Sequence, residues 1–259
     1  MNSAEGLNCD LTGHIATITI DRPQARNALT FEMVTALVRL YDRFDRDPAV
    51  RVVLLTSAPG PAFCAGMDIT QLGRPDSAEV IAEMPMSGSA RNIFEVMIEC
   101  GKPTIAAIDG AAIGAGCELA LASDIRILSP RSFFALPESK IGMGANFGAQ
   151  MLPRLIPRGI AYEHLYTGRP IRAELAHRLG LANHIVSDVD SHAGTVCAEI
   201  AENAPLTVRR YKHVVSAGAD LPLAVALRQR PIPDPYRSSD RIEGMAAYTE
   251  GRIARWQDR

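Results

Sequence analysis

The sequence predicts an α/β protein, because short strand-like segments alternate with amphipathic helical segments along most of its 259 residues. This alternation continues to about residue 188, and only helical patterns follow it. We therefore predict an α/β core over residues 1–190 and a helical C-terminal region over residues 191–259. The short strands fit either a doubly wound sheet or a coiled succession of small ββα units, and the pattern alone does not choose between them.

The elements at the start of the core have the clearest local signals. Residues 14–20 alternate and are β-branched, which predicts a strand. Thr30 is a suitable N-cap for an amphipathic helix over residues 31–46. The expected elements that follow are a buried strand at 51–56, a short helix at 66–72, a surface loop at 73–88, a helix at 89–99, a strand at 104–109, a helix ending at 122, and strands at 125–128 and 132–135.

The C-terminal region is expected to be helical at residues 190–203, 206–217 and 241–256. Asp240 followed three residues later by Glu243 predicts a capping box at the start of the last helix. The proline-rich residues 231–235 predict a stiff, non-helical connector before it.

Composition excludes several classes of protein. Hydrophobic residues make up 47% of the chain and charged residues 22%, which is ordinary for a soluble globular protein. The net charge of −2 comes from 27 basic and 29 acidic residues, so we expect no nucleic-acid partner. The most apolar region, residues 104–122, is interrupted by two acidic residues and several glycines, so we expect no membrane span.

The positions of the cysteines and histidines predict a reducing compartment and no metal site. The five cysteines are scattered and include no CxxC pair, which favours a reducing compartment, and we expect a cytoplasmic protein without a signal peptide. The six histidines show no HExxH pattern and no i, i+4 pair, so no metal site is expected. Cys64 and Cys117 flank glycine-rich turns, where buried, unreactive thiols are the better interpretation.

Two glutamates are the strongest candidates for catalysis. Glu118 closes the glycine-rich bend at residues 113–118, and Glu138 follows the short apolar strand at residues 133–137. A carboxylate at the end of an apolar segment is costly to bury unless it is paired, solvated or held for proton transfer. Two such carboxylates beside exposed backbone amides would provide acid/base chemistry next to an oxyanion hole.

Two turns could supply those amides, at residues 62–68 and 113–118, because amides at a helix start attract negative charge. Each turn taken alone is more often a plain strand-to-helix connection. The chain also carries a linked series of motifs at residues 25–29, 62–68, 102–110, 114–120, 123–126, 134–138, 167–169, 176–182 and 241–248.

In order and spacing, this series resembles the enoyl-CoA hydratase/isomerase (crotonase) superfamily over nearly the whole chain. The resemblance implies a crotonase-like spiral of ββα units with a helical C-terminal trimerisation region, assembled as a homotrimer or as a hexamer built from two trimers. It also implies an acyl-CoA thioester as substrate, with coenzyme A present only as part of that substrate and no other cofactor.

The resemblance also assigns site residues by motif position. Glu118 and Glu138 fall on the two catalytic glutamates of the hydratases, where the first activates water and the second donates a proton. The amides of Met67 and Ala115 fall on the oxyanion hole. The residues expected to contact coenzyme A are Arg26, Asn27, Ala28, Ala65, Gly66, Asp68 and Gly114.

Having both glutamates favours an enoyl-CoA hydratase, a hydro-lyase that adds water across the 2,3 double bond. Alternatives are a Δ3-Δ2-enoyl-CoA isomerase, another crotonase-type acyl-CoA lyase or hydrolase, and a non-catalytic RNA-associated crotonase fold. The near-neutral charge argues against the last. Three departures leave the acyl group open: Ala115 replaces a glycine, Met67 replaces an alanine, and residues 141–148 replace a more glycine-rich, proline-containing segment.

Overall fold

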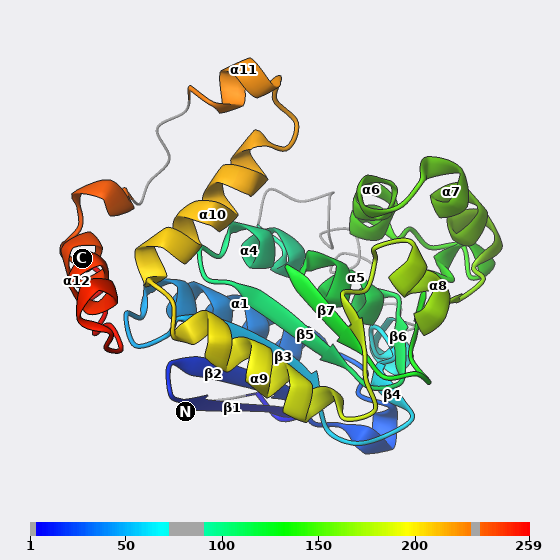
Figure 1. Cartoon of the computed structure of the whole chain (residues 1–259). Coiled ribbons are helices and arrows are strands. Elements are labelled where there is room, and N and C mark those ends of the chain that lie inside the picture. The colour runs from blue at the N-terminus through cyan, green and yellow to red at the C-terminus, as the bar shows by residue number, and fades with distance from the viewer. Residues whose placement is uncertain (1–3, 73–90, 229–233) are drawn as a thin grey trace.

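The structure is a computed structural model that describes residues 4–72, 91–228 and 234–259. A six-stranded sheet runs through its centre (Figure 1). In spatial order its strands are β1 (Leu7–Thr12), β2 (Ile15–Ile20), β3 (Val52–Ser57), β5 (Thr104–Ile108), β7 (Ile125–Leu128) and β10 (His184–Ile185). The pairing of β1 with β2 is antiparallel, and every other pairing in this sheet is parallel.

A second, four-stranded sheet consists of β4 (Ala62–Cys64), β6 (Ala111–Ile113), β8 (Phe133–Ala135) and β9 (Ile171–Arg172). Along the chain, β3, β5 and β7 of the large sheet are followed by β4, β6 and β8 of the small one. Each of these strand pairs leads toward a helix, so the core is a coiled succession of ββα units. The predicted α/β class is confirmed, and the doubly wound alternative is excluded.

Helices cover both faces of the large sheet. On β3, Val52 and Leu54 pack with α9 (Val189–Ala201), whereas Val53 and Leu55 belong to the main core on the other face. This alternation is the two-residue period of a strand buried on both sides. The helices on the main-core face are α1 (Phe31–Arg46), α4 (Ile93–Glu99) and α5 (Ala115–Ala122) (Figure 1).

The helix α9 contains the predicted division between the core and the C-terminal region. The predicted division between residues 190 and 191 falls in the first turn of this helix, which packs against β3 and β5. Figure 1 shows that α10 and α11 extend away from the sheets, so the helical part that stands apart begins after α9. The remaining helices are α2 (Ile69–Leu72), α6 (Asn146–Leu155), α7 (Arg158–Thr167), α8 (Ala173–Arg178), α10 (Pro205–Gly218), α11 (Leu223–Ala226) and α12 (Ser239–Glu250).

Three short 3₁₀ turns, at Pro23–Ala25, Glu138–Lys140 and Pro235–Arg237, complete the described elements. In the parts of the chain that the structure describes, no helix is both long and apolar enough to cross a membrane. The predicted loop at 73–88 and residues 231–233 of the predicted connector lie outside the described residues.

The N-terminal end of α1 confirms a local prediction. The helix occupies residues 31–46, and Thr30 caps it by accepting a hydrogen bond from Met33 N at 3.2 Å. In contrast, β1 was not predicted, although Leu7, Cys9 and Leu11 alternate with polar residues and face the core.

The predicted capping box at Asp240 and Glu243 is wrong. The N-cap of α12 is Ser238, whose Oγ accepts a hydrogen bond from Arg241 N at 3.1 Å. The Asp240 carboxylate instead accepts hydrogen bonds from the backbone of the C-terminal tail, and Glu243 pairs with Arg252. The helix also ends at residue 250, before the predicted residue 256, because the next residue is a glycine in the left-handed conformation.

Candidate active site

Two turns of the small sheet lie side by side. Because β4 and β6 are neighbouring parallel strands, the turn after Cys64 and the turn after Ile113 leave the sheet at the same edge. Gly66 has a φ of +96°, and a Cβ atom there would lie 3.0 Å from the carbonyl oxygen of Ile113 and 3.6 Å from the amide nitrogen of Ala115. Glycine at position 66 therefore allows the two turns to approach each other.

Each turn presents a free backbone amide. Within the described residues, neither the Met67 amide nor the Ala115 amide donates a hydrogen bond to a protein acceptor. Ala115 is the first residue of α5, where no acceptor exists inside the helix. Gly66 O accepts from Leu29 N at 2.8 Å, and in a trans peptide the Met67 N–H then points away from Leu29. This pair of free amides can bind a partial negative charge.

Glu118 lies in the first turn of α5 and is only 6% exposed. Its Oε1 accepts a hydrogen bond of 2.8 Å from Gly148 N, near the start of α6. Burial raises the pKa of this carboxyl group to about 7, and the negative charge of Glu138 also raises it, while the Gly148 N–H opposes the change. A carboxyl group with a pKa near 7 can both take and release a proton at neutral pH.

Glu138 opens the 3₁₀ turn that follows β8, and its carboxylate points at the Gly114–Ala115 turn. Its Oε1 would lie 2.8 Å from a Cβ atom placed on Gly114. Its Oε2 is buried and has no hydrogen-bond partner within the described residues. Burial raises the pKa of this carboxyl group as well. An unpartnered buried carboxylate oxygen needs a hydrogen-bond partner, and a water molecule or a substrate could supply one.

The loop with the predicted coenzyme A contacts is held by buried polar groups. Asn27 has no exposed surface, and its Nδ2 donates to the carbonyl oxygens of Ala58 at 3.0 Å and Ala62 at 2.9 Å. The Asn27 side chain therefore shapes the loop and has no free group to offer a ligand. Arg26 is exposed, and its guanidinium makes no hydrogen bond or ion pair within the described residues.

The other predicted contacts also differ in what they can offer. Asp68 forms an ion pair with Arg22 at 3.1 Å and accepts two hydrogen bonds from Thr70, so its carboxylate is occupied by the protein itself. Hydrogen bonds from Thr70 and the charge of Arg22 lower the pKa of Asp68. The remaining predicted contacts are small residues in the turns, and they offer backbone groups: Ala28, Ala65, Gly66 and Gly114.

Cys64 and Cys117 are buried, as predicted. Burial raises the pKa of Cys64 to about 12, and that of Cys117 well above its ordinary value, so neither thiol is a nucleophile at neutral pH. Across the described ranges, no group of three or more His, Cys, Asp or Glu side chains is placed to hold a metal ion.

Two supporting residues were missed by the sequence reasoning. Gly148 donates to Glu118, and Arg22 pairs with Asp68, 46 residues further along the chain. The start of a helix near residue 146 could have suggested an amide for Glu118. No local signal in the sequence links Arg22 to Asp68.

Comparisons with known proteins show the family of this chain. Residues 10–259 match the family model described as Enoyl-CoA hydratase/isomerase. The chain is 37% identical over 248 residues to (E)-benzylidenesuccinyl-CoA hydratase of Thauera aromatica, covering 94% of this chain and 95% of that protein. It is 32% identical over 245 residues to short-chain-enoyl-CoA hydratase of Clostridium acetobutylicum, covering 93% of each.

A solved structure of an enoyl-CoA hydratase has the same fold as this chain. The crystal structure of an enoyl-CoA hydratase from Bacillus anthracis superposes with a TM-score of 0.90 at 30% identity, covering 98% of this chain and 100% of that one. The chain belongs to the enoyl-CoA hydratase/isomerase family, and its fold is the crotonase fold.

Proposed function

We propose that this chain is an enoyl-CoA hydratase, a hydro-lyase that reversibly adds water across the 2,3 double bond of an α,β-unsaturated acyl-CoA thioester. The observation that carries the proposal is the pair of buried carboxylates, Glu118 and Glu138, beside the free amides of Met67 and Ala115. Hydration requires one group to deprotonate water and another to protonate carbon. A double-bond isomerase needs only one carboxylate to move a proton.

The two amides would bind the thioester carbonyl oxygen. As water adds, negative charge develops on this oxygen, because the intermediate resembles an enolate. Donors that are already aimed at that oxygen stabilise the charge without reorganising during the reaction. The Met67 and Ala115 amides suit this role because neither donates to a protein acceptor among the residues that the structure describes.

The carboxylates would transfer the protons. Glu118, held by Gly148 N–H, removes a proton from water while the water oxygen bonds to Cβ. The electron pair of the double bond passes through the enolate to form the new Cα–H bond with a proton from Glu138, which begins the cycle protonated, whereas Glu118 begins it ionised. The unpartnered Oε2 of Glu138 supports a place for this residue beside the water and the substrate. Proton exchange between the two groups then restores the starting state.

Coenzyme A would enter as part of the substrate, and no other cofactor is proposed. The guanidinium of Arg26 is the best candidate to bind its phosphates, because it is exposed and has no partner in the described part of the chain. Backbone groups of Ala28, Ala65, Gly66 and Gly114 remain the proposed contacts for the rest of the carrier. Asn27 and Asp68 would hold the loop and the turn that carry these contacts, because their side chains are already bonded within the protein.

The proposal is tested by replacing each carboxylate with its amide. Glu118→Gln and Glu138→Gln should each lower kcat by about 10²–10⁴-fold with little change in the affinity for a saturated acyl-CoA. Glu163→Gln is the matched control, because Glu163 is 59% exposed on α7 and forms an ion pair with Arg169. Full activity in either site variant would remove that residue from the mechanism.

Product analysis separates the hydratase from its alternatives. The parent protein should convert 2-enoyl-CoA thioesters to 3-hydroxyacyl-CoA products. Conversion of 3-enoyl to 2-enoyl thioesters without hydration would instead identify an isomerase. A panel of enoyl-CoA thioesters that differ in chain length and substitution would define the acyl group.

We also propose that the chain assembles as a homotrimer or as a hexamer of two trimers in the cytoplasm. The C-terminal helices expose large apolar side chains, which include Val215, Leu223, Leu227 and Tyr248 at 70–87% exposure. Apolar surface of this extent usually marks an interface between proteins. All five cysteines are free, which fits a reducing compartment.

A further inference from the structure

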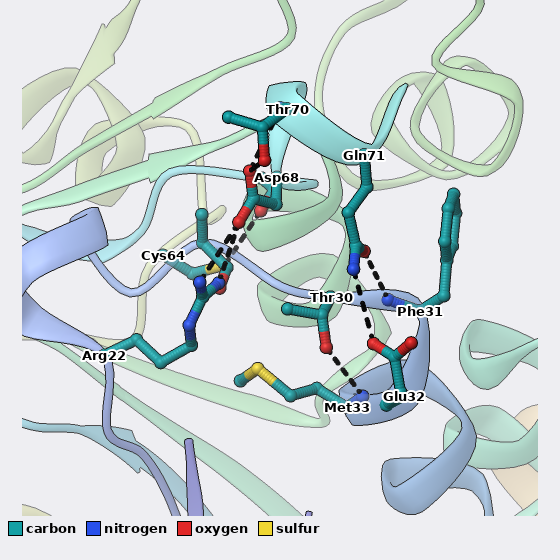
Figure 2. A network of polar contacts seen from close by, with 11 residues as sticks. Arg22, Thr30, Phe31, Glu32, Met33, Cys64, Asp68, Thr70 and Gln71 are labelled. Carbon is teal, nitrogen blue, oxygen red and sulfur yellow. Dashed lines mark hydrogen bonds and ion pairs between the residues drawn. The ribbon is translucent and has the colours of Figure 1, made fainter. Parts of the chain in front are cut away.

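Arg22 connects the two segments that form the Met67 side of the site. Its Nη1 donates to the carbonyl oxygen of Ala28 at 2.8 Å. Both Nη1 and Nη2 donate to Asp68 Oδ2 at 3.1 Å (Figure 2). The side chains of Arg22 and Asp68 are 20% and 14% exposed, so water only partly screens the pair. One guanidinium thus bonds the residue before Leu29 and the residue after Met67.

The contacts of Arg22 with Ala28 and Asp68 stabilise the bridge between Leu29 and Met67. It is an isolated parallel bridge, in which Leu29 N donates to Gly66 O and Asp68 N donates to Leu29 O, each at 2.8 Å. These two bonds fix the peptide planes on both sides of Met67, and therefore the direction of its N–H. The chain continues into α2, which has only four residues and adds little rigidity.

A second contact holds α2 itself. Gln71 Oε1 accepts a hydrogen bond of 3.0 Å from Phe31 N at the start of α1 (Figure 2). Asp68 also accepts two hydrogen bonds from Thr70 through Oδ1, which is not the oxygen that meets Arg22. These contacts are independent of Arg22, so the turn should remain folded when the guanidinium is replaced.

We propose that Arg22 is a positioning residue that aims the Met67 amide at the substrate carbonyl. The inference rests on the proposed function, because it assumes that this amide binds the thioester oxygen. Arg22 acts through the Leu29–Met67 bridge and needs no contact with substrate. Its planar fork reaches a carbonyl and a carboxylate at once, which a lysine ammonium does not reproduce.

The test compares Arg22→Lys with Arg131→Lys. Arg131 is a matched control, because its guanidinium also bonds one carboxylate, that of Asp109, and one carbonyl oxygen, that of Gly60. These partners precede β6 and β4, at the opposite end of the small sheet from the two turns. Asp68→Asn is a second variant that breaks the same ion pair from the other side and can retain the bonds from Thr70.

Two measurements report on the Met67 amide. The first measures kcat and KM separately for hydration of an enoyl-CoA. The second is the infrared carbonyl band of a bound saturated acyl-CoA that carries ¹³C at the thioester carbon, because hydrogen bonds to that oxygen lower its stretching frequency. The infrared measurement requires no turnover, so it tests the role of Arg22 even if the parent protein shows no hydration activity. An absence of hydration activity would contradict only the proposed function.

Complete loss of one oxyanion donor costs about 10²–10³-fold in kcat, so a misaimed donor should cost about 10–100-fold. We expect this loss in Arg22→Lys and Asp68→Asn, with KM within about threefold and the carbonyl band moved toward that of the free thioester. Arg131→Lys should match the parent in both. An unchanged kcat and carbonyl band in Arg22→Lys would overturn the proposal. Unfolding of both site variants beside a folded Arg131→Lys would also overturn it, because Arg22 would then be purely structural.

Discussion

Replacing Glu118 with Gln should make the protein more stable at neutral and alkaline pH while it lowers activity. The side chain is 6% exposed, and its burial disfavours the ionised form, which raises its pKa from an ordinary value of 4.5 to about 7. Gln has nearly the same shape, and its Oε1 can still accept the hydrogen bond from Gly148. It carries no charge at any pH, so the cost of burying a charge disappears.

The size and sign of the effect follow from linkage. Because the pKa of Glu118 is higher in the folded state, the contribution of this residue to stability is fully present below pH 4.5 and is lost as pH rises through about 7. Each pKa unit corresponds to about 1.4 kcal/mol, so the total loss is about 3 kcal/mol. The stabilising effect of Glu118→Gln should therefore be about 2 kcal/mol larger at pH 8.5 than at pH 5.5.

Urea unfolding of the parent and the variant at these two pH values measures the effect, at one protein concentration because assembly also contributes to stability. Glu163→Gln, at a side chain that is 59% exposed, is the control for the chemical change from Glu to Gln. A difference between Glu118→Gln and the parent that is the same at both pH values would refute the reasoning. Such a result would mean that Glu118 does not bear the cost of a buried charge in the folded protein.

Three further predictions concern activity and assembly. If Glu118 must be ionised to activate water, kcat/KM should fall as pH drops below about 7, and a rate that stays constant down to pH 5 would contradict this. Ala115→Gly keeps the amide but removes a methyl group, so activity on bulkier α-substituted thioesters should rise, while the rate with small ones stays within about tenfold; an unchanged acyl profile would place Ala115 away from the substrate. Truncation after residue 203, which removes α10, α11 and α12, should cause aggregation or loss of the native assembly in light scattering, and a soluble, active monomer would contradict the trimer.

The elements that could be predicted from the sequence are those whose signals are local. The helix at residues 31–46 has an apolar face and a threonine N-cap, and both lie within the segment itself. Glu118 could be singled out because it closes a glycine-rich bend that leads into an apolar segment, although the sequence did not decide whether its carboxylate is buried or solvated. Periodicity and capping act over a few residues, so a single sequence contains them.

The parts that could not be predicted depend on contacts between distant residues. The capping box at Asp240 has a correct local pattern, yet the carboxylate of Asp240 binds the backbone of residues 257 and 258 instead. Similarly, Asp68 was expected to face the ligand, and its partner Arg22 comes from a loop before α1. A local pattern shows what a side chain could bind, whereas the fold determines which partner is near it.

The site contains backbone amides and, beside them, side chains, and the two are held in different ways. This difference explains why substrate preference can change while the fold does not. The free amides are backbone groups, fixed by close contact between turns, and a Cβ on Gly116 would collide with the carbonyl oxygen of Cys64. Met67 and Ala115 can therefore vary in side chain without losing the donor. Relatives of this chain are named for benzylidenesuccinyl-CoA and for short-chain enoyl-CoA, which differ in the acyl group and share the thioester. If the Met67 and Ala115 amides bind the thioester as proposed, their side chains would lie beside the acyl group, and the acyl profile of Ala115→Gly tests this for Ala115.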